Sequence, residues 1–246
     1  NEQQFRLNFQ PQVDIKNGNI IGMECLIRWS HPVQGEIPPF KFIKLAEDTG
    51  MIIPIDRWVF EQAISQLAEW LKAGLNPGVL SINLSMVQIG HSDFIEFVTQ
   101  TLEAYQMAPA NIMFEVTETA VMQDPHHSII MLKRLDELGI GIAIDDFGTG
   151  HSSLAYLKQL PIKKLKIDRS FIKDIPTDQE DVELTRAIIG IAHGLRLSLV
   201  AEGVETQEQV DFLSENGCME AQGYLYYKPM EVDSIWETLK TVKEVV

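Results

Sequence analysis

The order of apolar and polar positions along the chain predicts an antiparallel start followed by a helical segment. Residues 5–15 and 20–29 are apolar runs of β-prone residues, and the Asn17-Gly18 pair between them is a strong hairpin signal. A helix is then expected over residues 55–71, because apolar residues recur there at every fourth position: Ile55, Val59, Ala63, Leu67 and Leu71.

From residue 79 onward the pattern repeats regularly. Further strands are expected at 79–83, 112–116, 140–144, 162–167, 197–201 and 220–222, and further helices at 40–47, 94–105, 129–138, 152–157, 177–194, 206–217 and 235–242. A capping-box pattern from Thr177 to Glu180 marks one helix start, and Thr206 to Gln209 opens another.

The strands are too continuously apolar to have a solvated face, which predicts a parallel sheet covered by helices. At this chain length the closed form is an α/β fold, a modified (β/α)8 TIM-like barrel with an antiparallel first strand. An open doubly wound sheet is the alternative, and it is the weaker one because no Gly-rich phosphate loop follows the first strand.

Composition and charge limit the number of domains and the kinds of partner that this protein can have. The 246 residues are 45% hydrophobic and contain no Pro/Gly/Ser-rich linker, so residues 1–246 are expected to form one domain. The net charge of −15 argues against a nucleic-acid polymer as partner, whereas a phosphorylated substrate remains compatible if metal ions supply positive charge. The spacing of Cys25 and Cys218 fits neither a disulfide framework nor a metal finger, as expected in a reducing compartment.

Targeting signals are absent from the sequence. No apolar run approaches the roughly 20 residues that span a bilayer, so the domain is expected to be cytoplasmic. The chain begins without methionine, so we expect it to be a module of a longer multidomain protein that carries sensor or other signalling domains and leaves room for a membrane anchor.

The most informative stretch lies at Asp145-Asp146, where the apolar run 140–144 stops at two adjacent carboxylates. Neighbouring residues on a strand point to opposite faces, so both acids can face one point only if the strand has ended and the backbone is turning. Gly148 and Gly150 would permit that turn. The competing interpretation is an ordinary acidic turn that caps a helix.

Side chains able to bind metal or substrate recur at the ends of most predicted strands: Glu24, Asn83, Glu115, Asp145 with Asp146, Lys166, Glu202 and Gln222. In a barrel these ends converge on the face where catalysis occurs. Oxygen ligands alone favour Mg²⁺ or Mn²⁺ over zinc, and the excess of carboxylates favours two ions bridged by Asp145. Two ions roughly 3.5–4 Å apart are the arrangement that hydrolyses phosphodiesters.

Each of these residues also has an ordinary structural interpretation. Asn83 fits a helix N-cap, Gln222 a turn, and Lys166 the end of a solvated basic edge over 163–166; Glu24 or Glu202 alone could be a salt-bridged residue at the barrel rim. Taken together, however, these interpretations would require the same coincidence at six or seven strands. The six histidines show no metal-binding helical spacing, and no Gly-x-Ser-x-Gly elbow of a serine hydrolase is present.

With these motifs in place, the chain resembles the EAL-domain family of bacterial cyclic di-GMP phosphodiesterases over nearly its whole length. The matching segments are Gln10-Pro11 and residues 22–29, 82–85, 114–118, 145–150, 166–171, 201–206 and 222–224. The resemblance implies hydrolysis of one phosphodiester of cyclic di-GMP to linear pGpG with Mg²⁺ or Mn²⁺. Calcium is expected to inhibit, since its looser coordination fits a tight octahedral pair poorly.

The resemblance also implies roles for individual residues. Glu24, Asn83, Glu115 and Asp145 would hold one ion, and Asp145 with Asp146 would serve the second. Lys166 would position the attacking water or stabilise charge at the phosphate, and Glu202 is the implied general base. Glu118 resembles the residue that anchors the loop after Asp146, a loop linked in the family to dimerisation, so a homodimer is expected. The implied dinucleotide contacts are Gln10, Leu26, Arg28, Glu205 and Gln222.

Two positions depart from the family pattern. Cys25 stands where the family has its signature alanine, and a small side chain that alternates away from Glu24 should not disturb metal binding. His151 replaces the usual aromatic residue after Gly150, which affects loop packing and not the ligands.

Two other functions stay open at this point. One is a non-catalytic cyclic di-GMP receptor, although no ligand position is lost here. The other, without the resemblance, is a Mg²⁺-dependent barrel that uses Lys166 as a proton-abstracting base.

Overall fold

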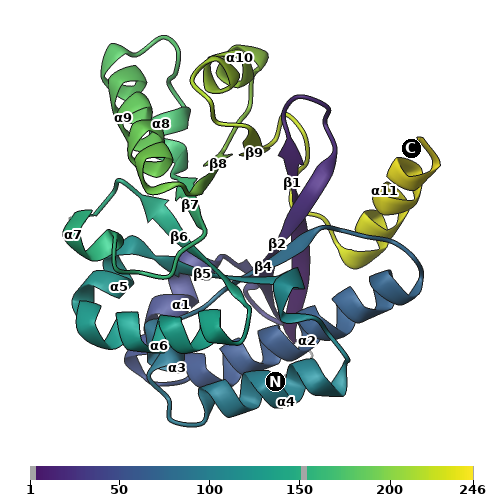
Figure 1. Ribbon diagram of the computed structural model, residues 1–246. Helices are drawn as coiled ribbons and strands as arrows, with labels where there is room; N and C mark the ends of the chain where they lie inside the picture. Colours follow the sequence, from purple (N-terminus) through teal and green to yellow (C-terminus); the bar gives the residue numbers. More distant parts are fainter. Residues whose placement is uncertain (1–3, 151–153, 246) are drawn as a thin grey trace.

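The computed structural model describes residues 4–150 and 154–245, and the strands within them form one closed sheet. The strand order is β1-β9-β8-β7-β6-β5-β4-β2-β3, and the additional pairing of β1 with β2 closes the ring. Figure 1 shows helices around the outside of this barrel. Closure confirms the predicted barrel and excludes the open doubly wound alternative.

The strands of the ring are β1 (Phe5–Asp14), β2 (Ile20–His31), β4 (Val79–Asn83), β5 (Ile112–Thr117), β6 (Gly141–Phe147), β7 (Lys164–Ile167), β8 (Ser198–Glu202) and β9 (Glu220–Gln222). β1 runs antiparallel to both of its neighbours, β2 and β9. The other neighbouring pairs around the ring are parallel. A short β3 (Gly35–Ile37) pairs with β2 outside the ring. The antiparallel first strand is therefore confirmed.

The helices cover the outer face of the sheet. They are α1 (Pro39–Asp48), α2 (Ile52–Lys72), α3 (Met86–Ile89), α4 (Phe94–Ala104), the 3₁₀ turn η2 (Pro109–Asn111), α5 (Glu118–Gln123), α6 (Pro125–Glu137), α7 (Leu154–Leu157), α8 (Arg169–Ile172), α9 (Gln179–Leu195), α10 (Gln207–Glu215) and α11 (Val232–Val245). The elements that sequence periodicity missed, β3, α3, α5 and α8, are too short to show a repeat. The helix predicted at 152–157 is seen from Leu154, and its first two residues lie outside the described part.

One predicted helix start is wrong by a residue. Asp178, not Thr177, caps α9, because its carboxylate accepts hydrogen bonds from the N–H groups of Glu180 and Asp181. The Thr177 hydroxyl instead donates to the carbonyl of Asp174 at 2.7 Å and closes the preceding turn. The helix also runs to Leu195, past the predicted end at Gly194. At α10, Thr206 and Gln209 form a reciprocal capping box.

Helix α2 packs against the sheet beside β1 and β4. Val59, Ala63 and Leu67, three of the residues predicted to share one helix face, are all buried. Phe9 of β1 and Trp70 of α2 are fully buried, and their rings meet edge to face at a centroid distance of 4.9 Å. This contact fixes the outer side of the antiparallel strand against the helix layer.

No helix among the described residues combines the length and apolar character that crossing a bilayer requires.

We predict that Phe9→Ala lowers the free energy of unfolding by about 3–5 kcal/mol, because it opens a cavity against Trp70 in a close-packed core. The matched control is Phe40→Ala, which removes a ring that is 78% exposed and should change stability by no more than about 0.5 kcal/mol. Urea unfolding followed by far-ultraviolet circular dichroism measures both. Equal losses in the two variants would contradict this account of the core.

Candidate metal centre

The parallel strands bring the predicted site residues to one end of the barrel. Apart from Glu24, each lies at or near the carboxyl end of its strand: Asn83 on β4, Glu115 on β5, Asp145 and Asp146 on β6, Lys166 on β7, Glu202 on β8 and Gln222 on β9. The expectation that Glu24 ends its strand is wrong, because β2 continues to His31, but its register opposite Ser81 of β4 still brings Glu24 to the same end of the barrel. The strand register places site residues of neighbouring strands side by side: Asn83 is opposite Glu115, and Glu202 is opposite Gln222. Residues that are distant in sequence thus face one space.

Lys166 lies at the centre of this group. It is 1% exposed, and its Nζ lies 2.6 Å from a carboxylate oxygen of Glu202 and 2.7 Å from one of Glu115. Carboxylate oxygens of Asp145 and Glu24 lie 3.0 and 3.4 Å from the same Nζ atom. The interpretation of Lys166 as a solvated edge residue is therefore wrong.

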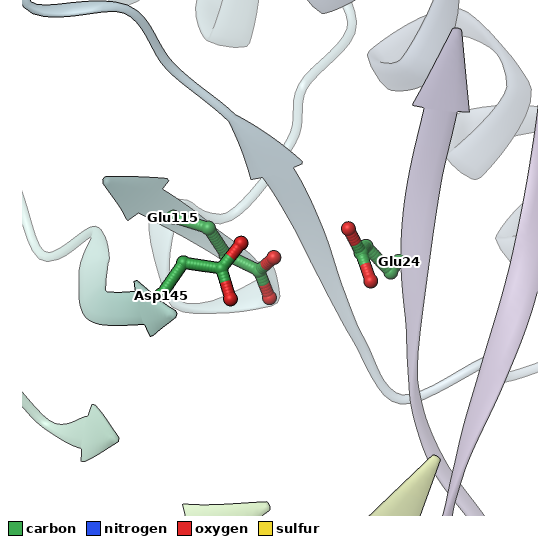
Figure 2. Close-up of side chains that lie close together, drawn as sticks. All are labelled: Glu24, Glu115 and Asp145. Carbon is green, nitrogen blue, oxygen red and sulfur yellow. The ribbon is translucent and has the colours of Figure 1, made fainter. Parts of the chain in front are cut away.

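Two carboxylate triads share Asp145. In the first, one oxygen each of Glu24, Glu115 and Asp145 lies within 4.8 Å of the others. Figure 2 shows Glu115 and Asp145 close together, with Glu24 opposite them. In the second triad, one oxygen each of Asp145, Asp146 and Glu202 again lies within 4.8 Å of the others. Asp145 thus occupies the position shared by two potential cation sites, and Glu202, predicted as a base, is also placed where it could act as a ligand.

A bulge in β6 allows both aspartates to face the centre. The strand continues to Phe147, so the expectation that it ends before the acids is wrong. Its pairing with β7 shifts register between Ile144 and Phe147, and Asp146 has a left-handed φ of 53°. That conformation breaks the alternation of side chains, which is what the paired acids require. The side-chain direction thus changes at Asp146, within the strand and before Gly148.

Amide side chains hold the Glu24 carboxylate. Asn83 Nδ2 donates to Glu24 Oε1 at 2.8 Å, and Gln222 Nε2 donates to Oε2 at 2.7 Å. Gln222 lies in β9 and is buried, so its interpretation as a turn residue is wrong. The helix cap expected at Asn83 is supplied by Ser85, whose hydroxyl accepts from the N–H of Gln88. Both amides are thus available to orient a ligand.

Burial and the excess of negative charge shift the pKa values of the carboxyl groups. Burial, together with Glu24 and Asp145, raises the pKa of Glu115 to about 8 despite the opposing charge of Lys166. Burial also raises the pKa of Glu202 well above its ordinary value, and burial and Asp145 raise that of Asp146 to about 6. Burial opposes ionisation of Glu24 as well, but Lys166 and the two amides outweigh it and lower its pKa. Lys166 keeps a strongly raised pKa, because its carboxylate neighbours outweigh its burial.

The residues present fit hard divalent cations. The donors are carboxylate and amide oxygens, the ligand type of Mg²⁺ and Mn²⁺. Glu115 Oε1 is buried and has no hydrogen-bond partner among the described residues, so it is free to coordinate. The ammonium group of Lys166 pairs with four carboxylates and Asp146 adds a fifth to the cluster, so added positive charge would relieve the remaining repulsion.

Two cavities flank the metal centre and share Leu26. The first, the Asp56 cavity, has a volume of about 290 Å³ and is lined by Arg28, Asp56, Asn83 and Glu115 among others. The second, the Glu205 cavity, has a volume of about 230 Å³, and its lining includes Gln10, Glu24, Arg169, Glu202, Glu205, Gln222 and Tyr224. The predicted dinucleotide contacts are therefore distributed over both cavities.

Sequence reasoning missed Asp56 and Arg169. Asp56 accepts hydrogen bonds from the hydroxyl and N–H of Ser85 at 2.6 and 3.2 Å, and burial raises its pKa to about 7. Arg169 donates to Glu205 at 2.8 Å in the second cavity. Asp56 lies in the first turns of a helix, where no strand-end pattern could reveal it.

The loop after Asp146 is attached to the barrel by Glu118. This residue is 1% exposed, and its Oε2 accepts a hydrogen bond from the N–H of Gly148 at 2.8 Å. A Cβ added at Gly150 would lie 2.8 Å from Glu118 Oε1, so the absence of a side chain here leaves room for the Glu118 carboxylate. His151, one of the two departures, lies outside the described residues.

Cys25, the other departure, is 2% exposed. Its burial raises the pKa of the thiol above the ordinary range, which agrees with an inert cysteine.

The chain is similar in sequence to two proteins of Pseudomonas aeruginosa. The chain is 42% identical over 232 residues to the bifunctional diguanylate cyclase/cyclic di-GMP phosphodiesterase MucR of Pseudomonas aeruginosa, covering 94% of the chain and 34% of MucR. It is also 42% identical over 242 residues to the cyclic di-GMP phosphodiesterase NbdA of the same organism, covering 98% of the chain and 31% of NbdA. The chain thus spans about a third of the length of these relatives.

A solved structure shows the same architecture. The PaMucR phosphodiesterase in complex with c-di-GMP superimposes with a TM-score of 0.90 at 42% identity, over 95% of this chain and 94% of that one. The family model described as EAL domain matches residues 1–229. The chain belongs to the EAL domain family, as its motifs predicted.

Proposed function

We propose that this domain hydrolyses one phosphodiester bond of cyclic di-GMP and releases linear pGpG, using two Mg²⁺ or Mn²⁺ ions. The observation that supports this most directly is the pair of carboxylate triads that share Asp145 at the barrel mouth. Family membership and the names of MucR and NbdA support the substrate class.

The proposed ligands follow the two triads. Glu24, Asn83, Glu115 and Asp145 would hold one ion, and Asp145, Asp146 and Glu202 would hold the second. Such ions, when bound, supply the positive charge that activates a water and stabilises the leaving oxygen. The family pattern alone did not assign Glu202 to the second ion, and its place in that triad is the reason to do so.

Lys166 and Glu202 have proposed roles beside the ions. The Lys166 ammonium, held by carboxylates on several strands, would offset charge that develops on the phosphate oxygens. The second oxygen of Glu202 would accept the proton of the attacking water once the ions keep this carboxylate ionised. The chain has a net charge of −15, so the anionic substrate depends on local positive charge of this kind.

The two cavities suit a dinucleotide with two guanine bases. A guanine presents neighbouring N1–H and N2–H donors, and each cavity contains a carboxylate acceptor, Asp56 in one and Glu205 in the other. The metal centre lies between them, as expected for the phosphate linking two bases. Leu26 lines both cavities, and the half-buried Arg28 would face the second phosphate.

We propose that the domain acts as a homodimer inside a longer signalling protein. The greater length of MucR and NbdA supports the longer protein. The dimer is proposed from the resemblance to the EAL family, in which the loop after Asp146 is linked to dimerisation, and Glu118 holds that loop in this chain.

With Mg²⁺ or Mn²⁺ the purified chain is expected to convert cyclic di-GMP into pGpG, and with Ca²⁺ it should form no product, because calcium fits the tight octahedral pair poorly. Chromatographic separation of substrate and product measures the rate in each ion. Binding of cyclic di-GMP without pGpG in any ion would instead favour the receptor function.

Glu24→Ala or Asp145→Ala should lower kcat by more than about a hundredfold, because each removes an anionic ligand, a loss at least as severe as that of an outer-shell partner. Glu61→Ala, which removes an exposed carboxylate on α2, is the matched control and should retain the wild-type rate. Circular dichroism verifies folding of the three variants. A rate near that of the wild type in either ligand variant would refute the two-ion proposal.

The metal-free chain should lose thermal stability between about pH 5 and 8. The pKa of Glu115 is raised from 4.5 to about 8 and that of Asp146 from 3.8 to about 6, so the folded state binds protons more tightly than the unfolded state. Their stabilising contribution is therefore complete at low pH and is lost as pH rises through these values. Calorimetry in chelator measures the decrease, which Mg²⁺ should reverse mainly at high pH. In Glu115→Gln the decrease should be smaller, and an unchanged profile would contradict the assignment.

A further inference from the structure

Three glutamine side chains form a connected group inside the barrel next to the metal centre. Gln10 and Gln12 come from β1 and Gln222 from β9, and each is at most 7% exposed. Gln12 Nε2 donates to Gln222 Oε1 at 3.0 Å. Gln222 Nε2 then donates to Gln10 Oε1 at 3.0 Å and to Glu24 Oε2 at 2.7 Å. The bonds run in one direction, from Gln12 through Gln222 to Glu24.

The orientation of the Gln222 amide decides whether Glu24 is held. An amide has a donor end and an acceptor end, and a flip would turn Gln222 Oε1 toward the Glu24 carboxylate, oxygen against oxygen. Gln12 favours the orientation that holds Glu24, because its N–H group finds an acceptor in Oε1 of Gln222. Gln10, whose Nε2 donates to the carbonyl of Tyr227, supports the same orientation by accepting from Nε2 of Gln222. A buried polar group without a hydrogen-bond partner raises the free energy of the folded state, so the preference for this orientation is strong.

The backbone is shaped to allow this contact. The β1–β2 register shifts between Gln12 and Val13, and Gly22 lies opposite Gln12 on β2. A Cβ added at Gly22 would lie 3.3 Å from Gln12 Oε1 and 2.8 Å from the carbonyl oxygen of Val79. The glycine therefore leaves room for the Gln12 amide.

We propose that Gln12 is a positioning residue for the metal centre, which acts through Gln222 to keep the Glu24 carboxylate oriented for a divalent cation. The hydrogen bonds of Gln12 do not include a proposed metal ligand. The inference rests on the proposed function only in requiring that Glu24 binds metal. It extends the site to a residue on the antiparallel strand, which the strand-end pattern did not include.

The test measures Mn²⁺ affinity by titration calorimetry in the absence of any nucleotide. Gln12→Met keeps the size of the side chain but removes the donor, and it should weaken Mn²⁺ binding about tenfold or more, as the loss of an outer-shell partner does. Gln222→Met should weaken it at least as much. The double variant should bind no more weakly than Gln222→Met alone, because Gln12 has no effect without Gln222. A purely structural role for Gln12 would instead give additive losses.

The matched control is Gln88→Met on α3. Gln88 is fully buried, and its amide has no hydrogen-bond partner among the described residues, so its replacement should leave Mn²⁺ affinity unchanged. If Gln12→Met does not fold, Gln12→Asn, which withdraws the amide by one methylene group, makes the same test.

Wild-type Mn²⁺ affinity in a folded Gln12 variant, or additive losses, would overturn the positioning role without affecting the proposed hydrolysis. A wild-type chain that binds no Mn²⁺ would overturn the metal centre and the role of Gln12 with it.

Discussion

The repulsion among acidic side chains gathered at one end of the barrel is the constraint on which this structure depends. Glu115, Asp145 and Glu202 each lie within 3.0 Å of the single ammonium group of Lys166. Burial strengthens both the attraction and the repulsion, and burial together with the charges of Glu24 and Asp145 raises the pKa of Glu115 despite the nearby Lys166. A site with this imbalance is suited to cations, because they offset charge that the protein itself leaves uncompensated.

The topology of the barrel creates this concentration of charge. Parallel strands gather at one face, so acids from β2, β5, β6 and β8, two of them from β6, meet although they are far apart in sequence. The antiparallel β1 adds two further inward-facing amides, Gln10 and Gln12, beside Gln222 and Glu24. Charge from the acids and amides from β1, β4 and β9 together define the orientation of the ligands.

Much of the fold could be predicted because its signals are local. The hairpin at Asn17-Gly18, the four-residue repeat of α2 and the short apolar strands are each a property of neighbouring residues. Predictions failed where two local choices compete within one or two positions. Thr177 and Asp178 are both good caps, and the carboxylate of Asp178 forms two bonds while Thr177 turns back to Asp174. The β6 bulge was missed for the same reason, since a left-handed Asp146 allows the strand to continue.

By itself the sequence determined which residue types end each strand, and hence that the site would be made of oxygen ligands and one lysine. Only the tertiary structure decided how they are grouped: Glu202 with Asp145 and Asp146, Lys166 at the centre, and Asp56 in a flanking cavity. The physical reason is that the alternation and periodicity of a chain specify the direction of a side chain relative to its own strand or helix. Barrel closure and register set the distances between strands, and the ionisation of each acid depends on those distances.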